Sequence, residues 1–495
     1  MQRIAIYLLL GLSALSAEAR RYVAEFQNGD QIPALKPDGW GQPTDTPSIK
    51  GVQLFDPANP VRWILRTDPP PTNRIDAFVE FHNGDRLPGM VYAFDPGDDD
   101  ARRLSAPPTF LVAVDFPLRS SRRGALPVLR VNADMVRRIV WDGSEETPAQ
   151  TLRLRNGHRT GYRRVKWQTT GFQVLSESGV ETHAYGDPAE LTLPDRPFAD
   201  RFLNEVAALS PRLESRLVQL ETRHGLVATA SSLRYRPARF SAGSHPRQWF
   251  HLVHPAWSEE AFVVTVDHIQ AWRYFQPWEI PLTTLAPTST RYRAPLAHGW
   301  PWRRNTMADG ATLHLGGRWY GWGIGLHADT TLSYRLPEQA SRFRSTLHRR
   351  HSTVGSITLD DRPAWTSLTE GAIHPVQVEL GPPQHFGLHL QAGHPLHMFD
   401  QAEWLEPTLE FDRAWIQAQQ PGRWSQAIPA WKDWTPPADL VDRAIPVGRW
   451  ASPLGGNARY RWSSLVRQPP LILKRSSAIT SGRSRLHLSV IRPDP

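Results

Sequence analysis

The clearest hydrophobic pattern lies between Leu315 and Leu336, where bulky residues alternate with glycines and then with polar residues. A period of two is typical of β-strands, whose successive side chains point to opposite faces. Further segments of this kind continue to Phe411, roughly eight in all, with turn residues between them. The pattern predicts a β-sandwich or jelly roll. Its glycines leave one face bare, so that another backbone or a ligand can approach closely.

The N-terminal half contains a recurring Asn-Gly turn. Glu25–Asp30 reads Glu-Phe-Gln-Asn-Gly-Asp and recurs as Glu80–Asp85, with weaker copies at 154–158 and 222–225. Asn-Gly is a strong hairpin signal, because both residues accept positive φ. We therefore predict hairpins in tandem small β-barrel or meander units, which are too small to stand alone and should pair or stack. A calcium loop is the weaker alternative, since its other oxygen ligands are missing.

One stretch has a helical period instead. Apolar residues between Pro197 and Leu220 recur at helical spacing, and Pro211 should break the helix. We predict one helix near 197–210 in a fold that is otherwise mainly β.

Two motifs in the alternating region carry a resemblance to a known family. The first is Gly-x-Gly-Leu-His-Ala-Asp over Gly323–Asp329, and the second is formed by Asp400, Ala402 and Trp404. Over residues 290–412 the chain resembles the NPCBM module, a carbohydrate-binding domain named from glycoside hydrolases of family 98. The resemblance implies a galactose-binding-like β-sandwich that binds glycans. Residues 348–351 and 391–399 depart from the family's pattern.

The first residues resemble an export signal. Arg3 precedes an apolar run from Ile4 to about Leu15, and small residues at Ala17 and Ala19 fit a cleavage site. The run is too short to cross a membrane comfortably. We therefore expect a signal peptide at 1–19 and a mature protein that is periplasmic, extracellular or bound to the cell surface.

These patterns divide the chain into five segments. They are the signal peptide at 1–19, two small β units at 20–150, two further β units with a helix between them at 151–285, the NPCBM-like sandwich at 290–412, and a Trp- and Pro-rich β segment at 413–495 that is an incomplete second sandwich or supplies strands to a neighbour.

Composition narrows the chemistry. The chain has no cysteine, so it has no disulfide, thiolate metal site or cysteine nucleophile. Its net charge is +9 and its basic residues are mostly arginine, which pairs well with carboxylate and sulfate groups. For an exported protein we expect a polysaccharide or glycoconjugate partner, acidic glycans included. We expect no nucleic-acid partner and no membrane span after signal removal.

No catalytic motif was found. The sequence lacks a His-Glu-x-x-His zinc helix, a phosphate-binding loop and a Gly-x-Ser-x-Gly nucleophile turn. We therefore assign no catalytic residue. A pair of acidic residues across a cleft, as in glycosidases, could not be recognised from sequence alone.

A sugar site needs aromatic faces beside fixed polar groups. The candidates for carbohydrate binding are Trp319, Tyr320, Trp322, Asp329, Asp400 and Trp404. Trp322 and Trp404 lie in the family's framework motifs, so core packing is the alternative for both.

Histidine and carboxylate residues in the same two motifs suggest a structural divalent cation. The candidate ligands are His327, Asp329, His397 and Asp400. The alternative is that these side chains hydrogen-bond backbone groups at turns. We expect no other cofactor.

Three functions remain open. The first is a secreted, non-catalytic carbohydrate-binding protein that attaches to glycans or presents them. The second is a structural or protein-interaction component of a cell-surface assembly. The third is a hydrolase acting on polysaccharide through a site that the motifs do not reveal.

Overall fold

The computed structural model describes residues 21–412 with internal gaps, residue 414, and the segments 472–476 and 487–491. The gaps are 40–46, 69–75, 98–107, 115–127, 144–146, 195–215, 232–234, 241–247, 260–261, 277, 294–300, 337–339, 351–352, 368–371, 382–384 and 394–399. Within the described residues, no helix has the length and apolar character needed to cross a membrane. The predicted signal peptide at 1–19 and the predicted helix near 197–210 lie outside the described residues.

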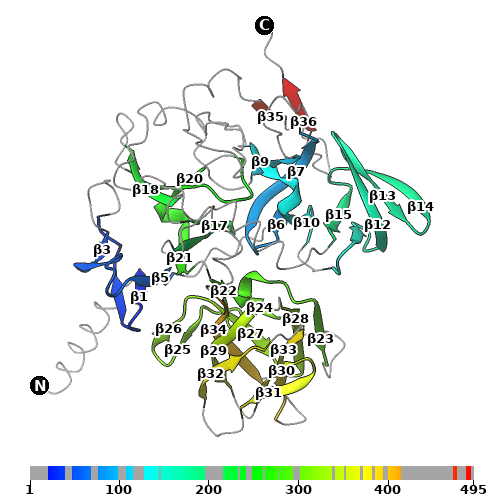
Figure 1. Cartoon of the computed structure of the whole chain (residues 1–495). Helices are drawn as coiled ribbons and strands as arrows, with labels where there is room; N and C mark the ends of the chain where they lie inside the picture. Colours follow the sequence, from blue (N-terminus) through cyan, green and yellow to red (C-terminus); the bar gives the residue numbers. More distant parts are fainter. Residues whose placement is uncertain are drawn as a thin grey trace, which may run out of the picture.

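The described chain is almost entirely β, as predicted: a large antiparallel sheet is followed by a sandwich (Figure 1). The large sheet has 16 strands, and its main path runs from the edge strand β14 to the edge strand β2. The strands are β1 (Tyr22–Phe26), β2 (Gln31–Ala34), β5 (Val61–Arg66), β6 (Phe78–Phe81), β7 (Arg86–Asp95), β8 (Thr109–Val114), β9 (Val128–Asn132), β10 (Val136–Val140), β11 (Thr151–Leu154), β12 (Arg159–Gln168), β13 (Gly171–Ser176), β14 (Gly179–Ala184), β15 (Pro188–Thr192), β16 (Leu217–Thr222), β17 (Val227–Ser231) and β21 (Ile269–Phe275).

Smaller elements lie beside this sheet. They are the pair β3 (Ser48–Ile49) and β4 (Val52–Gln53), the three-stranded sheet of β18 (Tyr235–Phe240), β19 (Gln248–Val253) and β20 (Phe262–Thr265), and the 3-10 turns η1 (Ala133–Met135) and η2 (Val266–His268). The C-terminal strands β35 (Ile472–Ser476) and β36 (His487–Ile491) pair with each other, within the segment 413–495 that is predicted to be β.

Each recurring glycine turn is a hairpin in the structure. The four hairpins are β1–β2, β6–β7, β11–β12 and β16–β17. Only the glycine has positive φ, for example 88° at Gly29 and 78° at Gly84. Asn28 and Asn83 instead use their side-chain oxygens to accept the N–H of the aspartate two residues later. The asparagine therefore works as a side-chain turn former, rather than through a left-handed backbone.

A later strand closes each hairpin by pairing with its first strand. The pairs are β1–β5, β6–β10, β11–β15 and β16–β21. Further pairs, β5–β21, β10–β15 and β7–β17, join the hairpins into one sheet. Because the sheet is continuous, the division of residues 20–285 into separate units stays a prediction.

The two faces of the large sheet differ in chemistry. One face packs into a hydrophobic cluster that includes Phe81, Phe172 and Trp257. The other carries alternating charges across four neighbouring strands: Glu80, Arg138, Glu190 and Arg153. Arg138 binds Glu80 at 2.8 Å and Glu190 at 3.2 Å, and Arg153 binds Glu190 at 3.3 Å. Both carboxylates are buried, so these pairs are screened little by water.

Asp85, from the second Asn-Gly turn, joins the hairpin β6–β7 to strand β17. Its carboxylate accepts the N–H and the hydroxyl of Thr229 and the indole N–H of Trp257, at 2.6, 2.7 and 2.8 Å. Complete burial outweighs these hydrogen bonds and raises the pKa of Asp85 to about 6. Protein donors occupy this carboxylate, which agrees with the hairpin interpretation rather than a calcium loop.

The second body is a sandwich of two sheets, as predicted. The six-stranded sheet contains β24 (Arg303–Arg304), β27 (Gly323–His327), β34 (Gln401–Phe411), β29 (Ala340–Arg349) and β32 (Ile373–Glu379), with β22 (Glu279–Pro281) on β34. The five-stranded sheet contains β23 (Ser289–Tyr292), β28 (Thr330–Arg335), β33 (His385–Gln391), β30 (Val354–Leu359) and β31 (Arg362–Thr366). The turn η3 (Leu282–Thr284) leads in, and β25 (His314–Leu315) and β26 (Arg318–Trp319) form a separate short hairpin.

The core of the sandwich lies between these two sheets. Ile324, Phe343, Phe386 and Trp404 are fully buried in it. Since every second residue of these strands points inward, the alternation read from the sequence describes this core directly.

The chain itself covers the bare glycine face of β27. A Cβ on Gly325 would lie 2.4 Å from the backbone nitrogen of Ala308 and 2.5 Å from the carbonyl carbon of Met307. A Cβ on Gly321 would lie 2.4 Å from the Trp63 ring of the large sheet. The glycines therefore admit the chain's own backbone and a neighbouring indole rather than a ligand.

We expect Gly325→Ala to destabilise the sandwich by about 1–3 kcal/mol, because backbone must move to admit the methyl group. Gly381→Ala is the matched control, since nothing lies within 4 Å of its added Cβ, and it should change stability by less than about 1 kcal/mol. Urea unfolding measures both. Equal midpoints for the two variants would show that residues 306–308 do not lie on Gly325.

Candidate functional site

Trp319 and Tyr320 lie where the sandwich meets the large sheet. The backbone N–H of Trp319 donates to the Gln31 side chain at 3.1 Å, and its carbonyl accepts from the same amide at 2.7 Å. His314 stacks on the Trp319 ring with the centroids 4.3 Å apart. Both predicted aromatics are partly buried. Each ring is therefore partly covered by the protein and partly exposed to solvent.

Trp322 and Trp404 are buried. Trp322 packs edge-on against Phe275, and its indole N–H donates to the carbonyl of Pro407 at 3.3 Å. Trp404 is fully buried in the sandwich core, where Trp365 packs against it edge-on. Both indoles therefore pack inside the protein, which was the alternative given for these framework positions.

Asp329 and Asp400 hold one loop at the end of the sandwich. Asp329 accepts the backbone N–H of Ala392 at 3.1 Å, and Asp400 accepts that of Gly393 at 3.3 Å. The carbonyl of Asp400 also accepts the N–H of Ala328 at 2.9 Å. Asp329 has a left-handed backbone, with φ of 57°. Both side chains make the turn-stabilising contacts that were the alternative to metal binding.

The structure does not bring the four proposed metal ligands together as a set. His327 lies on β27, paired with Gln401, and burial lowers its pKa, which favours the neutral ring. His397 lies outside the described residues. Among the residues that the structure describes, no group of three or more His, Asp or Glu side chains is placed to hold a metal ion.

A polar cluster that the sequence did not single out lies beside Asp400. We call it the apical cluster and define it as Asp309, His348, Arg350, Gln401 and Glu403. Glu403 is fully buried and lies 2.9 Å from Nδ1 of His348 and 3.4 Å from Arg350. Arg350 also lies 3.1 Å from the Gln401 side chain and 3.3 Å from Asp309.

The sheet register produces this cluster. Glu403 on β34 pairs with His348 on β29 and with Gly325 on β27. The bare Gly325 lets residues 306–308 cross the sheet, which brings Asp309 to Arg350. Exposure decreases stepwise from Asp309 through Arg350 and His348 to Glu403. The arrangement therefore presents fixed donors and acceptors at a half-buried surface, as hydroxyl recognition requires.

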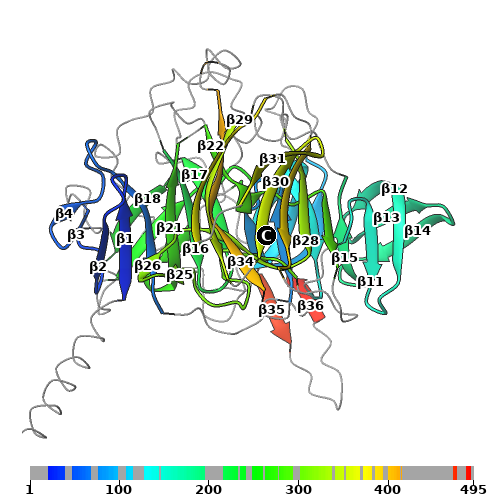
Figure 2. The same cartoon turned by 90° about the horizontal axis from the view of Figure 1, so that it is seen from below.

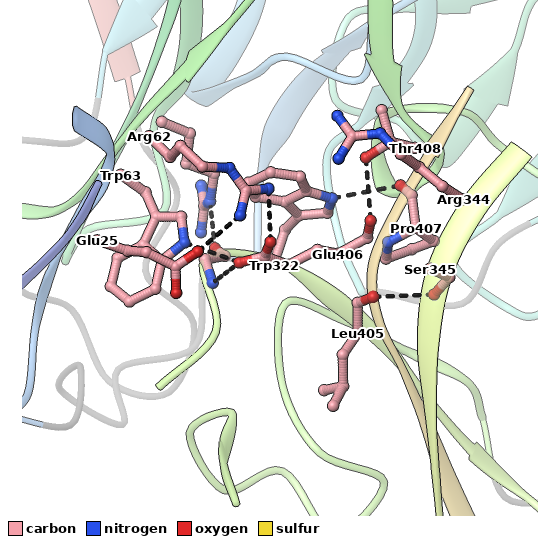
Figure 3. Close-up of polar contacts among 12 residues, drawn as sticks. Glu25, Arg62, Trp63, Trp322, Arg344, Ser345, Leu405, Glu406, Pro407 and Thr408 are labelled. Atoms are coloured by element: carbon pink, nitrogen blue, oxygen red, sulfur yellow. Dashed lines mark hydrogen bonds and ion pairs between the residues drawn. The ribbon is translucent and has the colours of Figure 1, made fainter. Parts of the chain in front are cut away.

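A second cluster, at the junction of the two bodies, fixes their relative position (Figure 3). Glu406 accepts the indole N–H of Trp63 at 2.7 Å and the N–H of Gly321 at 3.2 Å, and it pairs with Arg62 at 2.6 Å. Arg62 also pairs with the buried Glu25 at 2.6 Å. Burial, followed by the nearby Glu406 charge, raises the pKa of Glu25.

Glu406 reaches this junction through a bulge in β34. Two residues, Glu406 and Pro407, lie opposite Ser345 of β29, and Glu406 has φ of 49°. The Ser345 hydroxyl donates to the carbonyl of Leu405 at 2.8 Å, and the Thr408 hydroxyl donates to that of Glu406 at 3.0 Å (Figure 3). A bulge redirects a side chain out of the alternating pattern. Sequence alternation alone therefore gave no sign of this contact.

Comparison with known proteins identifies the sandwich. Residues 281–410 match the model of the NPCBM/NEW2 domain. The predicted boundaries, 290–412, are close to this range. The NPCBM domain thus covers about a quarter of the chain, with the large sheet before it. No curated protein matches the chain.

Several solved structures are similar to the chain. CBM51 from Clostridium perfringens GH95, in complex with methyl-galactose, has 19% identity and a TM-score of 0.24, covering 26% of this chain and 99% of that one. The tandem CBM51 modules of a family 98 glycoside hydrolase from Streptococcus pneumoniae have 9% identity and a TM-score of 0.24, covering 54% and 89%. CBM51-2 and the INT domains of Clostridium perfringens ZmpB, with GlcNAc, have 11% identity and a TM-score of 0.24; the chain covers 43% of that structure.

Proposed function

We propose that this protein is exported and binds carbohydrate without cleaving it, through its NPCBM domain. The match over residues 281–410 and the sandwich fold support a carbohydrate-binding domain. The signal-like first residues support export. Since the sequence has no recognisable catalytic motif, retention of a glycan is a simpler role than its hydrolysis.

The observation that carries this proposal is the apical cluster. Arg350 and His348 supply donors and Asp309 and Gln401 supply acceptors, while the fully buried Glu403 holds Arg350 and His348 in place. Preorganised polar groups lower the entropy cost of binding a ligand that is rich in hydroxyl groups. We place the sugar there, with Asp329 and Asp400 shaping the adjoining loop. Trp319 and Tyr320 remain candidates for contacts with a longer glycan.

Substitution of Arg350 tests the site in the full-length chain. We expect Arg350→Ala to weaken binding by roughly tenfold or more, because an arginine contact to a polar ligand and the order of the cluster are both lost. The measurement is a glycan array, followed by affinity electrophoresis in the glycan that binds best. Asp309→Ala, at a more exposed position, should weaken binding in the same direction with less effect on folding.

Arg342→Ala is the matched control. Arg342 lies on β29 at the opposite end from Arg350, and it pairs with Glu379 and Glu410. It should leave binding within about twofold of the parent protein. If Arg342→Ala and Arg350→Ala behave alike, or if no glycan binds the parent protein, the apical cluster is not a sugar site.

A structural role is the second candidate function. The observation that favours it is the burial of Trp322 and Trp404, together with the two bonds from Gln31 to Trp319. Much of the predicted aromatic surface thus contributes to packing. An array without any bound glycan, from a protein that unfolds cooperatively, would favour this role over carbohydrate binding.

A further inference from the structure

Strands β12, β13 and β14 form a ribbon at one end of the large sheet. In two views related by 90° they lie at the far side from β1–β3 (Figures 1 and 2). Strand β14 is the last strand of the sheet on this side. The NPCBM domain packs elsewhere on the sheet, so the ribbon is a separate surface.

The two faces of this ribbon are unlike. On the inner face Val174, Phe172 and Trp167 pack with the core of the large sheet. The register places the other residues on the outer face in two rows across the strands. One row is Arg164, Leu175 and Val180, and the next is Lys166, Gln173 and Thr182. The outer face thus combines cations on β12 with an apolar and amide surface on β13 and β14.

A β-bulge adds a third cation to this face. The register of β12 shifts between Tyr162 and Arg164, so Arg163 is an extra residue. Strict alternation would turn Arg163 toward the core, on the same side as Val165. Instead Arg163, Arg164 and Lys166 are all exposed. The bulge therefore keeps two consecutive arginines in solvent, where bulges often redirect functional side chains.

These three cations differ from most arginines in the described part of the chain. Arg62, Arg138, Arg273 and Arg344 each bind a carboxylate within 3.2 Å. In the described residues, Arg163, Arg164 and Lys166 form no ion pair or hydrogen bond with another side chain. The ribbon has two acidic residues. Glu181 lies on the inner face and accepts hydrogen bonds from Ser176 and Ser178, and Glu177 is exposed in the turn between β13 and β14, outside the two rows. Neither row of the outer face contains an acidic residue, so the charge of this face is positive.

We propose that the outer face of the β12–β14 ribbon binds acidic polysaccharide, with carboxylate or sulfate groups, at a site separate from the NPCBM domain. Arg164 and Lys166 lie roughly 7 Å apart along the strand, so successive anionic groups of an extended chain can each meet a cation. Gln173 and Thr182 offer hydrogen bonds, and Leu175, 39% exposed, offers an apolar surface to the sugar rings. The choice of a polysaccharide over other polyanions rests on the proposed function.

The test uses the full chain and two acidic probes, heparin and polygalacturonate, with dextran as the neutral probe. The triple variant Arg163→Gln, Arg164→Gln and Lys166→Gln should bind both acidic probes roughly tenfold more weakly or worse at low salt. The parent protein should lose the same binding as salt rises to about 0.5 M, because the contacts are exposed. Dextran should not distinguish the triple variant from the parent protein. Affinity electrophoresis measures the binding of each protein to all three probes under the same conditions.

A charge-matched control separates the ribbon from a general effect of net charge. Arg291→Gln, Arg335→Gln and Arg362→Gln together remove the same charge from exposed positions of the five-stranded sheet. This control should bind both acidic probes within about twofold of the parent protein's affinity. Equal loss in both triple variants would overturn the proposal, as would a parent protein that binds neither acidic probe. Tighter binding to vesicles of anionic phospholipid than to either polysaccharide would also overturn it.

The same preparations distinguish this inference from the proposed function. Arg350→Ala should weaken glycan-array binding and leave retention on heparin unchanged. The ribbon variant should do the reverse. The parent protein could bind no glycan on the array and still be retained on heparin, with the ribbon variant abolishing that retention. This result would reject the proposed sugar site in the NPCBM domain and leave the ribbon site standing.

Discussion

Glu80→Ala should destabilise the protein by about 3–5 kcal/mol, one of the largest effects expected from a single side chain. The Glu80 carboxylate is 1% exposed and is bound by Arg137 at 2.7 Å, Arg138 at 2.8 Å and Arg304 at 3.2 Å. Removal of the carboxylate leaves these cations close together without the charge that they surround. Urea unfolding at pH 7 measures the change.

The effect should depend on pH in a defined direction. The nearby arginines outweigh the cost of burial and hold the pKa of Glu80 well below its ordinary value of 4.5. A depressed pKa in the folded state contributes stability above the unfolded pKa, and this contribution is lost as the pH falls through the folded pKa. Glu80→Gln should therefore lower the free energy of unfolding most at neutral pH. The difference in free energy of unfolding between this variant and the parent protein should become smaller below about pH 4.

Glu177→Ala is the control, because Glu177 is exposed in the turn between β13 and β14. It should shift the free energy of unfolding by less than about 0.5 kcal/mol at any pH. A Glu80→Ala variant as stable as this control would mean that the charged face of the sheet is open to water.

The sequence predicted the strands and the sandwich because alternation records burial directly. Ile324, Leu326 and Leu332 are all fully buried in the core that their spacing indicates. The glycine turns at Gly29 and Gly84 were predicted because a positive φ nearly requires glycine. How the four hairpins join into one sheet was not predictable, since the pairs β5–β21 and β7–β17 connect strands far apart in sequence.

The candidate site was harder to predict for a related reason. Trp322 was identified by its motif, but its burial depends on Phe275 and Arg62, which lie in another part of the chain. Glu403 stands inside the recognised Asp400–Trp404 motif, so a charged residue at a core-strand position was an available signal. Arg350 had no such signal, because its contacts depend on a loop that crosses Gly325.

Trp63→Ala is the second substitution with a large expected effect, about 3–5 kcal/mol. The ring is fully buried between the two bodies, against Gly321 and in a cluster with Phe275 and Trp322. Its N–H donates to Glu406 at 2.7 Å. Trp63→Phe keeps most of the buried area and loses a hydrogen bond to a charged acceptor, so it should cost about 1.5–3 kcal/mol.

The two substitutions Trp63→Ala and Trp404→Ala should destabilise different parts of the protein. Trp63 lies outside the sandwich core, whereas Trp404 lies within it. Trp63→Ala should therefore uncouple the two bodies, so that unfolding separates into two transitions and protease cleaves near 276–280 earlier. Trp404→Ala should lower the transition of the NPCBM domain itself. A single, cooperative transition in Trp63→Ala, with unchanged cleavage, would show that the charged pairs Arg62–Glu406, Arg318–Glu25 and Arg304–Glu80 hold the bodies together without the indole.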